Sequence, residues 1–375
     1  MAIGFVLCVV GAAVDIRRTA AAYLVAYVAC LAVVLGALAM IGIARATAAT
    51  WFIVLRRQAE QIVATLPAFG ILFIPVLLAV RLLYPWARQE GSPELLAAIT
   101  AKSAYLNLPF FIVRAAIYWI VWIGFGETLR QASVRQDRGD SPELERRLRI
   151  ASAGGLVAFA ITVTFASIDW MMSLAPTWYS TIYGVNYFAG AMVGALALLA
   201  TLIARGRRHG ELLDTVGVEH VHALAKLLLT FVLFWVYIGF SQFIVIWSAE
   251  IPAESSWYVM RARTSWGYLG VLLVAGHFAL PFCALLIRAI KRSISAMAAI
   301  GVWLLVMHYA DVYWTVMPDA TESPAGAAHG WWIDLGALLL VAGIGSATWA
   351  IRRAGEPAVP RGDPGLVTSL DYSTD

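Results

Sequence analysis

The chain has 375 residues, of which 61% are apolar and 13% are charged, and its formal net charge is +4. Soluble domains average roughly 45–50% apolar and about 25% charged residues, so a water-soluble fold could not cover this much apolar surface. The composition therefore excludes a soluble globular protein and predicts an integral membrane protein. The small net charge also argues against nucleic-acid binding.

The three cysteines, Cys8, Cys30 and Cys283, all lie inside apolar stretches. None of them belongs to a C-x-x-C or C-x-x-C-H pattern. A thiolate metal site, an attached c-type haem and a disulfide framework are therefore not expected.

Long apolar segments recur along the chain, and crossing the hydrocarbon takes about 20 such residues per helix. The sequence predicts an all-α protein whose spans lie near 1–14, 19–43, 61–82, 104–127, 149–168, 181–204, 222–248, 266–288, 294–316 and 331–351. The first span is short and ends at Asp15, so a protein with one span fewer is the alternative. The transmembrane domain is expected to cover 1–351, and the proline-containing polar tail 352–375 is expected to be disordered.

Lysine and arginine are concentrated in the loops after the second, fourth, sixth, eighth and tenth predicted spans. Cytoplasmic loops of membrane proteins carry such an excess. These loops and both termini are therefore expected in the cytoplasm, while segments 169–180 and 317–330 are expected to face the outer side.

The fourth predicted span carries Asn107, Phe111, Arg114 and Tyr118 on one face,. Ionisable residues at membrane depth are costly and indicate function by default. Arg114 is expected to extend toward the outer side and to meet an acid there, with a purely structural ion pair as the alternative. Asp169 lies at the outer end of the fifth span, where it is either a proton-handling group or a solvated helix cap.

The later spans hold a second set of polar residues. Trp235 and Gln242 share a face of the seventh span, where helix packing is the alternative role. His308 and Asp311 on the ninth span are close enough for the carboxylate to orient the imidazole, and His277 lies on the eighth span. Such groups could exchange protons with a buried redox ligand, or they could form a hydrogen-bonded core network.

Motifs spread over residues 17–318 form a recognisable set. They include Ser167-Ile168-Asp169-Trp170-Met171-Met172-Ser173-Leu174, Lys102-Ser103-Ala104-Tyr105-Leu106-Asn107, Phe234-Trp235-Val236-Tyr237, His277-Phe278 and Tyr313-Trp314. Together these motifs resemble NrfD/polysulfide-reductase-type membrane subunits, and more closely the second NrfD-like subunit of bacterial alternative complex III. The match departs from the family at Ala223, where an acid is expected before Lys226. Proton entry through residue 223 is therefore in doubt, with substitution by His220 and His222, or the absence of such a route, as the alternatives.

The resemblance implies two four-helix bundles, built from spans two to five and six to nine, with outer helices added. It implies a subunit of a quinol:electron-acceptor oxidoreductase in the bacterial inner membrane, with menaquinone or its quinol as ligand. The expected partners are a multi-haem cytochrome c subunit, iron–sulfur subunits, a second NrfD-like membrane subunit and lipids. Because the redox centres lie on those partners in the family, no metal is expected in this chain.

For that function the candidate residues fall into two sets. Proton handling is assigned to Asp169, His277, His308 and Asp311, with Arg114 as the counter-charge that keeps an acid ionised. The quinone ring is expected among Asn107, Trp170, Trp235 and Gln242. Two other classes remain open: a secondary transporter, in which matching broken helices would bind a solute, and a structural anchor subunit of a larger complex.

Overall fold

The computed structural model describes residues 1–139, 142–249, 251–321 and 330–373, and within these the chain is helical with no strand. Nine helical segments of this described part are long and apolar enough to cross a membrane, which confirms an all-α polytopic membrane fold. The α-helices, with two short 3₁₀ segments (η1, η2) and one π-helical turn (η3), are α1 Ala2–Val14, α2 Ile16–Ala46, η1 Thr50–Phe52, α3 Ile53–Val63, α4 Leu66–Leu72, α5 Ile74–Leu78, α6 Val80–Leu83, α7 Pro85–Arg88, α8 Pro93–Ala101, α9 Leu108–Gln136, α10 Pro142–Trp170, η2 Met172–Leu174, α11 Tyr183–Arg208, α12 Val218–Ala249, α13 Pro252–Ala262, α14 Trp266–Leu273, η3 Val274–Ala279, α15 Leu280–Leu286, α16 Arg288–Lys291, α17 Ile294–Thr321, α18 Trp331–Arg353 and α19 Leu366–Leu370.

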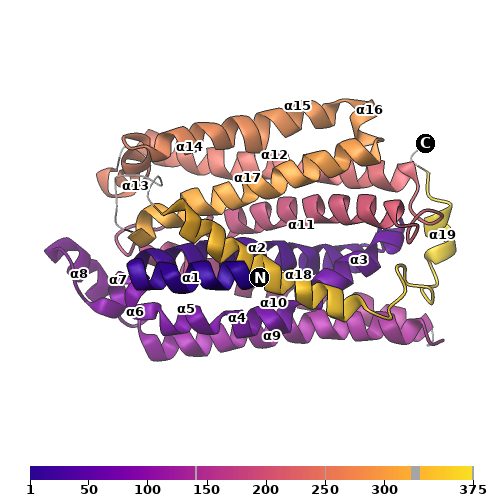
Figure 1. The fold of residues 1–375 in the computed structure, drawn as a ribbon, viewed down its shortest axis with the longest axis horizontal. Helices are drawn as coiled ribbons and strands as arrows, with labels where there is room; N and C mark the ends of the chain where they lie inside the picture. Colours follow the sequence, from indigo (N-terminus) through magenta and orange to yellow (C-terminus); the bar gives the residue numbers. More distant parts are fainter. Residues whose placement is uncertain (140–141, 250, 322–329, 374–375) are drawn as a thin grey trace.

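The long helices form two groups that pack side by side (Figure 1). The first group consists of α2, the broken span from α3 to α5, α9 and α10, and the second consists of α11, α12, the α14–α15 span and α17. Helices α1 and α18 pack on each other, and α18 also packs on α2. In each group a short helix with proline at its first position precedes the third span, α8 in the first and α13 in the second. The grouping agrees with the pair of bundles expected for spans two to five and six to nine.

Helices α2 and α11, the first helix of each group, lie at the centre of the protein. The sequence Gly-Ala-Leu-Ala occurs in both helices, at 36–39 and at 194–197. A Cβ atom at Gly36 would be only 2.1 Å from the carbonyl oxygen of Ala191 in α11. Small residues allow helix backbones to approach closely in lipid, so the two helices pack tightly because Gly36 has no side chain.

Prolines break the second span into short helices. Proline stands at the start of α4 and α5 within this span, and it interrupts a helix because it cannot donate a backbone hydrogen bond. Carbonyl groups freed in this way need other donors inside a membrane. Tyr23 and Tyr27 of α2 supply them, since their hydroxyls donate to the carbonyls of Leu72 at 2.8 Å and Phe69 at 3.1 Å.

The first predicted span is the 13-residue helix α1, which runs antiparallel to α18. Its contact with α18 is close, because a Cβ atom at Gly4 would be 2.5 Å from the backbone nitrogen of Leu340. At about 1.5 Å per residue α1 is roughly 20 Å long, which is shorter than the roughly 30 Å hydrocarbon core. The structure therefore adds α1 as a short helix to the nine full-length spans of the described residues.

The C-terminal tail differs from the disordered segment expected for 352–375. Residues 354–373 cross the ends of several helices and include α19. Asp363 forms an ion pair with Arg56, and the buried Ser369 accepts a hydrogen bond from the amide of Val54 at 3.4 Å. The expectation was wrong because the tail binds buried charges of α3, which the composition of the tail alone does not reveal.

The loops that are rich in lysine and arginine share one end of the protein, which we call the tail end because the C-terminal tail crosses it (Figure 1). At this end Arg45, in the last turn of α2, pairs with Glu145 near the start of α10, and Arg353 pairs with Glu211. The opposite end carries α6, α7, α8 and α13. The loops that were expected to share one side of the membrane because of their lysine and arginine content thus lie at the same end of the protein.

Replacing Gly36 by valine is expected to destabilise the protein, because the new side chain would meet the backbone of α11. Overpacking of a tight interface costs about 1–3 kcal/mol. Gly154→Val is the matched control, since a Cβ atom at Gly154 meets no atom within 4 Å. Thermal unfolding of the purified protein in detergent should show a lower midpoint for Gly36→Val alone. Equal midpoints for the two variants would contradict the close packing of α2 on α11.

Candidate functional site

A buried arginine–aspartate pair lies toward the end of the protein opposite the tail. Arg114 of α9 faces Asp169 of α10, with its Nε donating to Asp169 Oδ2 at 2.8 Å and its Nη2 donating to Oδ1 at 2.9 Å. Tyr118 donates a third hydrogen bond to Oδ2 at 2.7 Å. All three side chains are buried. Because a planar guanidinium matches a carboxylate in this bidentate geometry, the pair is held in one orientation.

The local sequence explains why these side chains meet. Asn107 caps α9 by accepting a hydrogen bond at 3.0 Å from the backbone amide three residues later. Arg114 and Tyr118 then follow one turn apart on the same face, and α10 brings Asp169 to them from the neighbouring helix. The expectation that Arg114 meets an acid on this side is confirmed, whereas Asn107, a candidate quinone ligand from the sequence, serves as a helix cap.

A cavity of about 350 Å³ lies beside this pair. We call it the Tyr105 cavity, and its walls include Lys102, Ala104, Tyr105, Met172, Trp178 and Tyr179. Tyr105 connects the cavity to the ion pair, since the Arg114 guanidinium lies 3.8 Å from the centre of its ring and donates to its carbonyl at 3.0 Å. Ser173, also in the wall, donates to the backbone carbonyl of Asp169 at 2.6 Å.

Two polar groups of the cavity wall precede the membrane-spanning α9. The hydroxyl of Tyr105 is buried and has no hydrogen-bond partner among the described residues. Burial, and then the charge of Asp169, raise the pKa of Tyr105, so its hydroxyl keeps its proton and remains a donor. The Lys102 ammonium donates to the carbonyl of Pro176 at 2.7 Å, and burial lowers the pKa of Lys102. The donor that the wall presents is thus the Lys102 ammonium, on a surface that is otherwise largely aromatic and apolar, while the Tyr105 hydroxyl is buried beside Asp169.

Trp170, a candidate for the quinone site, does not line the Tyr105 cavity. It packs among Tyr27, Phe73, Trp119 and Trp122, with ring centroids 4.6–6.4 Å away. Its indole N–H has no hydrogen-bond partner in the described part of the chain. In the structure this tryptophan is therefore a packing residue between α10, α2, α9 and the broken second span.

The polar residues of the later spans form a separate cluster in the second bundle. Asp311 accepts a hydrogen bond from the Nε1 of Trp235 at 3.0 Å, and His308 Nε2 lies 3.1 Å from the carbonyl oxygen of Ala29. Both side chains face Gly190, where a Cβ atom would be 3.5 Å from Asp311 Oδ2 and from His308 Nδ1. They line a small cavity of about 20 Å³, which has room for about one water molecule.

His277 lies beside this cluster, and Gln242 does not. The π-helical turn η3 holds the fully buried His277 against Trp235, with 4.1 Å between the ring centroids. Neither ring nitrogen of His277 has a hydrogen-bond partner among the residues described. Gln242 lies further along α12, outside both cavities. The sequence candidates therefore form two clusters, and no hydrogen bond between described residues joins Asp169 to Asp311.

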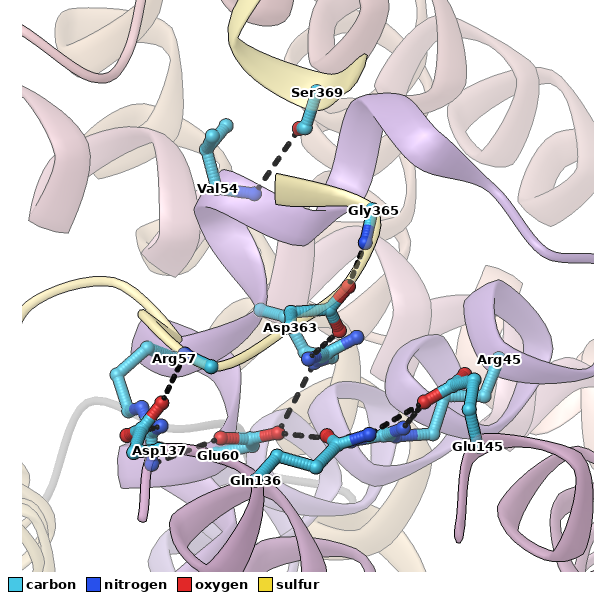
Figure 2. Close-up of polar contacts among 12 residues, drawn as sticks. Arg45, Val54, Arg57, Glu60, Gln136, Asp137, Glu145, Asp363, Gly365 and Ser369 are labelled. Atoms are coloured by element: carbon cyan, nitrogen blue, oxygen red, sulfur yellow. Dashed lines mark hydrogen bonds and ion pairs between the residues drawn. The ribbon is translucent and has the colours of Figure 1, made fainter. Parts of the chain in front are cut away.

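A cluster of buried charges at the tail end was not predicted from the sequence (Figure 2). Glu60 of α3 lies 3.7 Å from Arg45, 3.3 Å from Arg56 and 3.5 Å from Arg57. The cluster is completed by Gln136, Asp137, Glu145 and Asp363. The predicted third span began at residue 61, so these charges were taken as part of a loop. The spacing of Arg56, Arg57 and Glu60 is typical of helical ion pairs and is the signal that indicates the longer helix.

Two further arginine–aspartate pairs lie at the end opposite the tail. Arg18 is 2.6 Å from Asp334, and Arg261 is 2.8 Å from Asp319. Neither pair lines the Tyr105 cavity. Ion pairing between helices is thus a repeated feature of this end, and the Arg114–Asp169 pair differs from the others by its position beside a cavity.

Across the described ranges, no group of three or more His, Cys, Asp or Glu side chains is arranged to hold a metal ion. In comparisons with known proteins, neither a protein-family model nor a curated protein matches the chain. Evidence on function therefore comes from the two clusters and from the Tyr105 cavity.

The Asp169→Asn substitution is expected to lower stability strongly, because Arg114 would remain charged in a buried site without its counter-ion. Removing one partner of a buried ion pair costs about 3–5 kcal/mol. Tyr118→Phe removes a single hydrogen bond from the same carboxylate and is expected to cost about 1–2 kcal/mol. Thermal unfolding in detergent ranks the two variants, and a larger loss for Tyr118→Phe would show that the guanidinium is not the main partner of Asp169.

Proposed function

We propose that this chain is an integral membrane subunit of a quinol:electron-acceptor oxidoreductase in the bacterial inner membrane, of the NrfD-like type present in alternative complex III. In this proposal the chain binds quinol at the Tyr105 cavity and takes up the protons that quinol releases. The electrons pass to haem c and iron–sulfur centres on partner subunits. One observation carries the proposal: the ion-paired carboxylate of Asp169 lies next to a tyrosine that forms the wall of a ligand-sized cavity.

The walls of the Tyr105 cavity suit a quinol head group. Its volume of about 350 Å³ falls within the roughly 300–1,000 Å³ of small-molecule sites. The rings of Tyr105, Trp178 and Tyr179 offer flat apolar surfaces, and the Lys102 ammonium offers a donor for a ring oxygen. This position for the quinone ring differs from the one expected from the sequence. The cavity wall does not include the expected ring contacts Asn107, Trp170, Trp235 and Gln242.

Oxidation of quinol releases two protons with its two electrons, so the site needs groups that accept protons. Asp169 is the first such group in the proposal, with Arg114 stabilising its charged form through their two hydrogen bonds,. His308 and Asp311 are proposed as the next groups. The small cavity that these two residues line is also lined by Met171, two residues after Asp169 in the chain, so the two clusters approach each other there.

The alternative of a structural anchor subunit is favoured by one specific observation. The Arg114 and Asp169 side chains satisfy each other in the same way as the Arg18–Asp334 pair, which borders no described cavity. A transporter is less well supported, because the breaks of the helices do not correspond: they fall in the second span of the first bundle and in the third span of the second bundle.

Comparing two aspartate variants separates the redox role from the structural one. Asp169→Asn and Asp334→Asn each break one arginine–aspartate pair at the same end of the protein. In the intact complex, quinol:acceptor turnover per assembled complex should fall about 100-fold for Asp169→Asn, the lower range for loss of a proton-transfer group. Asp334→Asn should retain turnover close to the wild type. Similar losses in both variants would assign Asp169 to assembly and packing.

Filling the Tyr105 cavity should block quinol without touching the ion pair. Ala104→Trp places an indole in the cavity wall, and Ser103→Trp places the same group on the exposed neighbouring residue outside it. The expected result is a KM for quinol raised about tenfold or more by Ala104→Trp alone, equivalent to about 1.4 kcal/mol of lost binding. An unchanged KM in an Ala104→Trp complex would place the quinol elsewhere.

A further inference from the structure

A second cavity, of about 300 Å³, lies at the tail end, and it shares no lining residue with the Tyr105 cavity. It is formed where α2 ends, η1 and α3 begin, α10 begins and the tail crosses them. We call it the Arg45 cavity, and its walls include Arg45, Ala48, Ile53, Arg56, Arg149 and Gly365. The nearby cluster of buried charges (Figure 2) provides two of its arginines.

The hydrogen bonds of this cavity leave cationic donors unused. Of its two acids, Glu145 accepts from Arg45 at 3.1 Å and from Gln136 at 2.9 Å, and Asp363 accepts from Arg56 and from a backbone amide of the tail. Arg45 is only 2% exposed; its Nη2 lies 3.7 Å from Glu60 Oε1, an ion pair longer than a hydrogen bond, and its Nε has no hydrogen-bond partner in the described part of the chain. A buried donor without an acceptor costs about 1–3 kcal/mol, so the cavity favours a ligand that brings acceptors.

Arg149 adds a positive charge at the rim of the same cavity. Its side chain is exposed and is held by no ion pair with another described residue. The cavity therefore joins a buried guanidinium to an exposed one, on helices that are far apart in sequence. Two arginines in such an arrangement match the oxygens of a phosphate group.

The position of the cavity relates it to the membrane surface. It lies at the end of the protein that collects the basic loops, next to the half-buried Trp51, a residue type that is enriched at membrane interfaces. Basic pockets between membrane helices on the cytoplasmic side are suited to anionic lipid head groups. We propose that the Arg45 cavity binds the phosphate of an anionic glycerophospholipid.

The position of Arg149 at the rim also predicts which lipid head group the cavity prefers. A phosphate in the cavity would accept hydrogen bonds from the Arg45 guanidinium, while Arg149 lies at the rim where the rest of a head group would extend. An uncharged glycerol group is tolerated there, whereas the ammonium group of a zwitterionic lipid would be repelled by Arg149. Phosphatidylglycerol is therefore preferred over phosphatidylcholine, and the bound lipid links α2, α10 and the tail.

Native mass spectrometry of the purified, delipidated full-length protein tests this proposal. Phosphatidylglycerol should bind one molecule to the cavity with at least about fivefold higher affinity than phosphatidylcholine, since one arginine charge near an anionic head group contributes about that factor. Arg149→Gln should weaken phosphatidylglycerol binding by about fivefold. Arg135→Gln, which removes an equally exposed charge from the last turn of α9 at the same end, should leave the affinity unchanged.

Three results of the lipid-binding measurements would overturn the proposal. These are equal affinity for the two lipids, equal weakening by Arg149→Gln and Arg135→Gln, and unaltered binding in Arg149→Gln. A parallel measurement with inorganic phosphate distinguishes a lipid head group from free phosphate as the bound anion. If phosphate alone, in the absence of lipid, raises the unfolding temperature as much as phosphatidylglycerol does, the cavity binds a free anion and the assignment to lipid is wrong. Because Arg149 is exposed, unfolding of Arg149→Gln in phosphatidylcholine should match the wild type.

Discussion

A guanidinium buried in a membrane protein needs a carboxylate from another segment, because lipid cannot solvate its charge. This requirement determines which helices are neighbours at both ends of the molecule. Arg114 joins α9 to α10, and Arg18 joins α2 to α18. At the tail end, Arg56 joins α3 to the C-terminal tail. The Tyr105 cavity depends on the first of these pairs, since Arg114 holds the ring of Tyr105 in the cavity wall.

The sequence alone predicted most of the fold. Apolar runs of spanning length located the nine long helices, because lipid leaves few alternatives to a helix of about 20 residues. The errors occurred where polar residues are buried by contacts distant in sequence. Glu60 and its arginines were assigned to a loop, and the tail around Asp363 was expected to be disordered, because each segment is polar until the other covers it. Local composition cannot report such mutual burial.

The candidate site was predicted less completely, for a different physical reason. Helical periodicity placed Arg114 on a face and at a depth, so its need for an acid on that side could be predicted. Periodicity does not say which neighbouring helix faces that surface, and so Trp170 and Trp235 were expected at one ring site although they pack in different bundles. Tyr105 lies in the turn before α9, where no periodic pattern indicates the direction of a side chain.

The π-helical turn that carries His277 also constrains how this helix can change in evolution. Such a turn contains one more residue than an α-helical turn, so deletion of a single residue within η3 would restore the regular helix and rotate one half against the other by about 100°. The carbonyl of Gly276 now accepts a hydrogen bond from Trp303 at 2.7 Å. Deletion of Val274 or Ala275 would pair that carbonyl with the amide of Leu280, whereas Pro281 has no amide to offer it, and the indole N–H of Trp303 would then lose its acceptor,. The extra residue of the π-helical turn and Trp303 are thus expected to be gained or lost together in evolution.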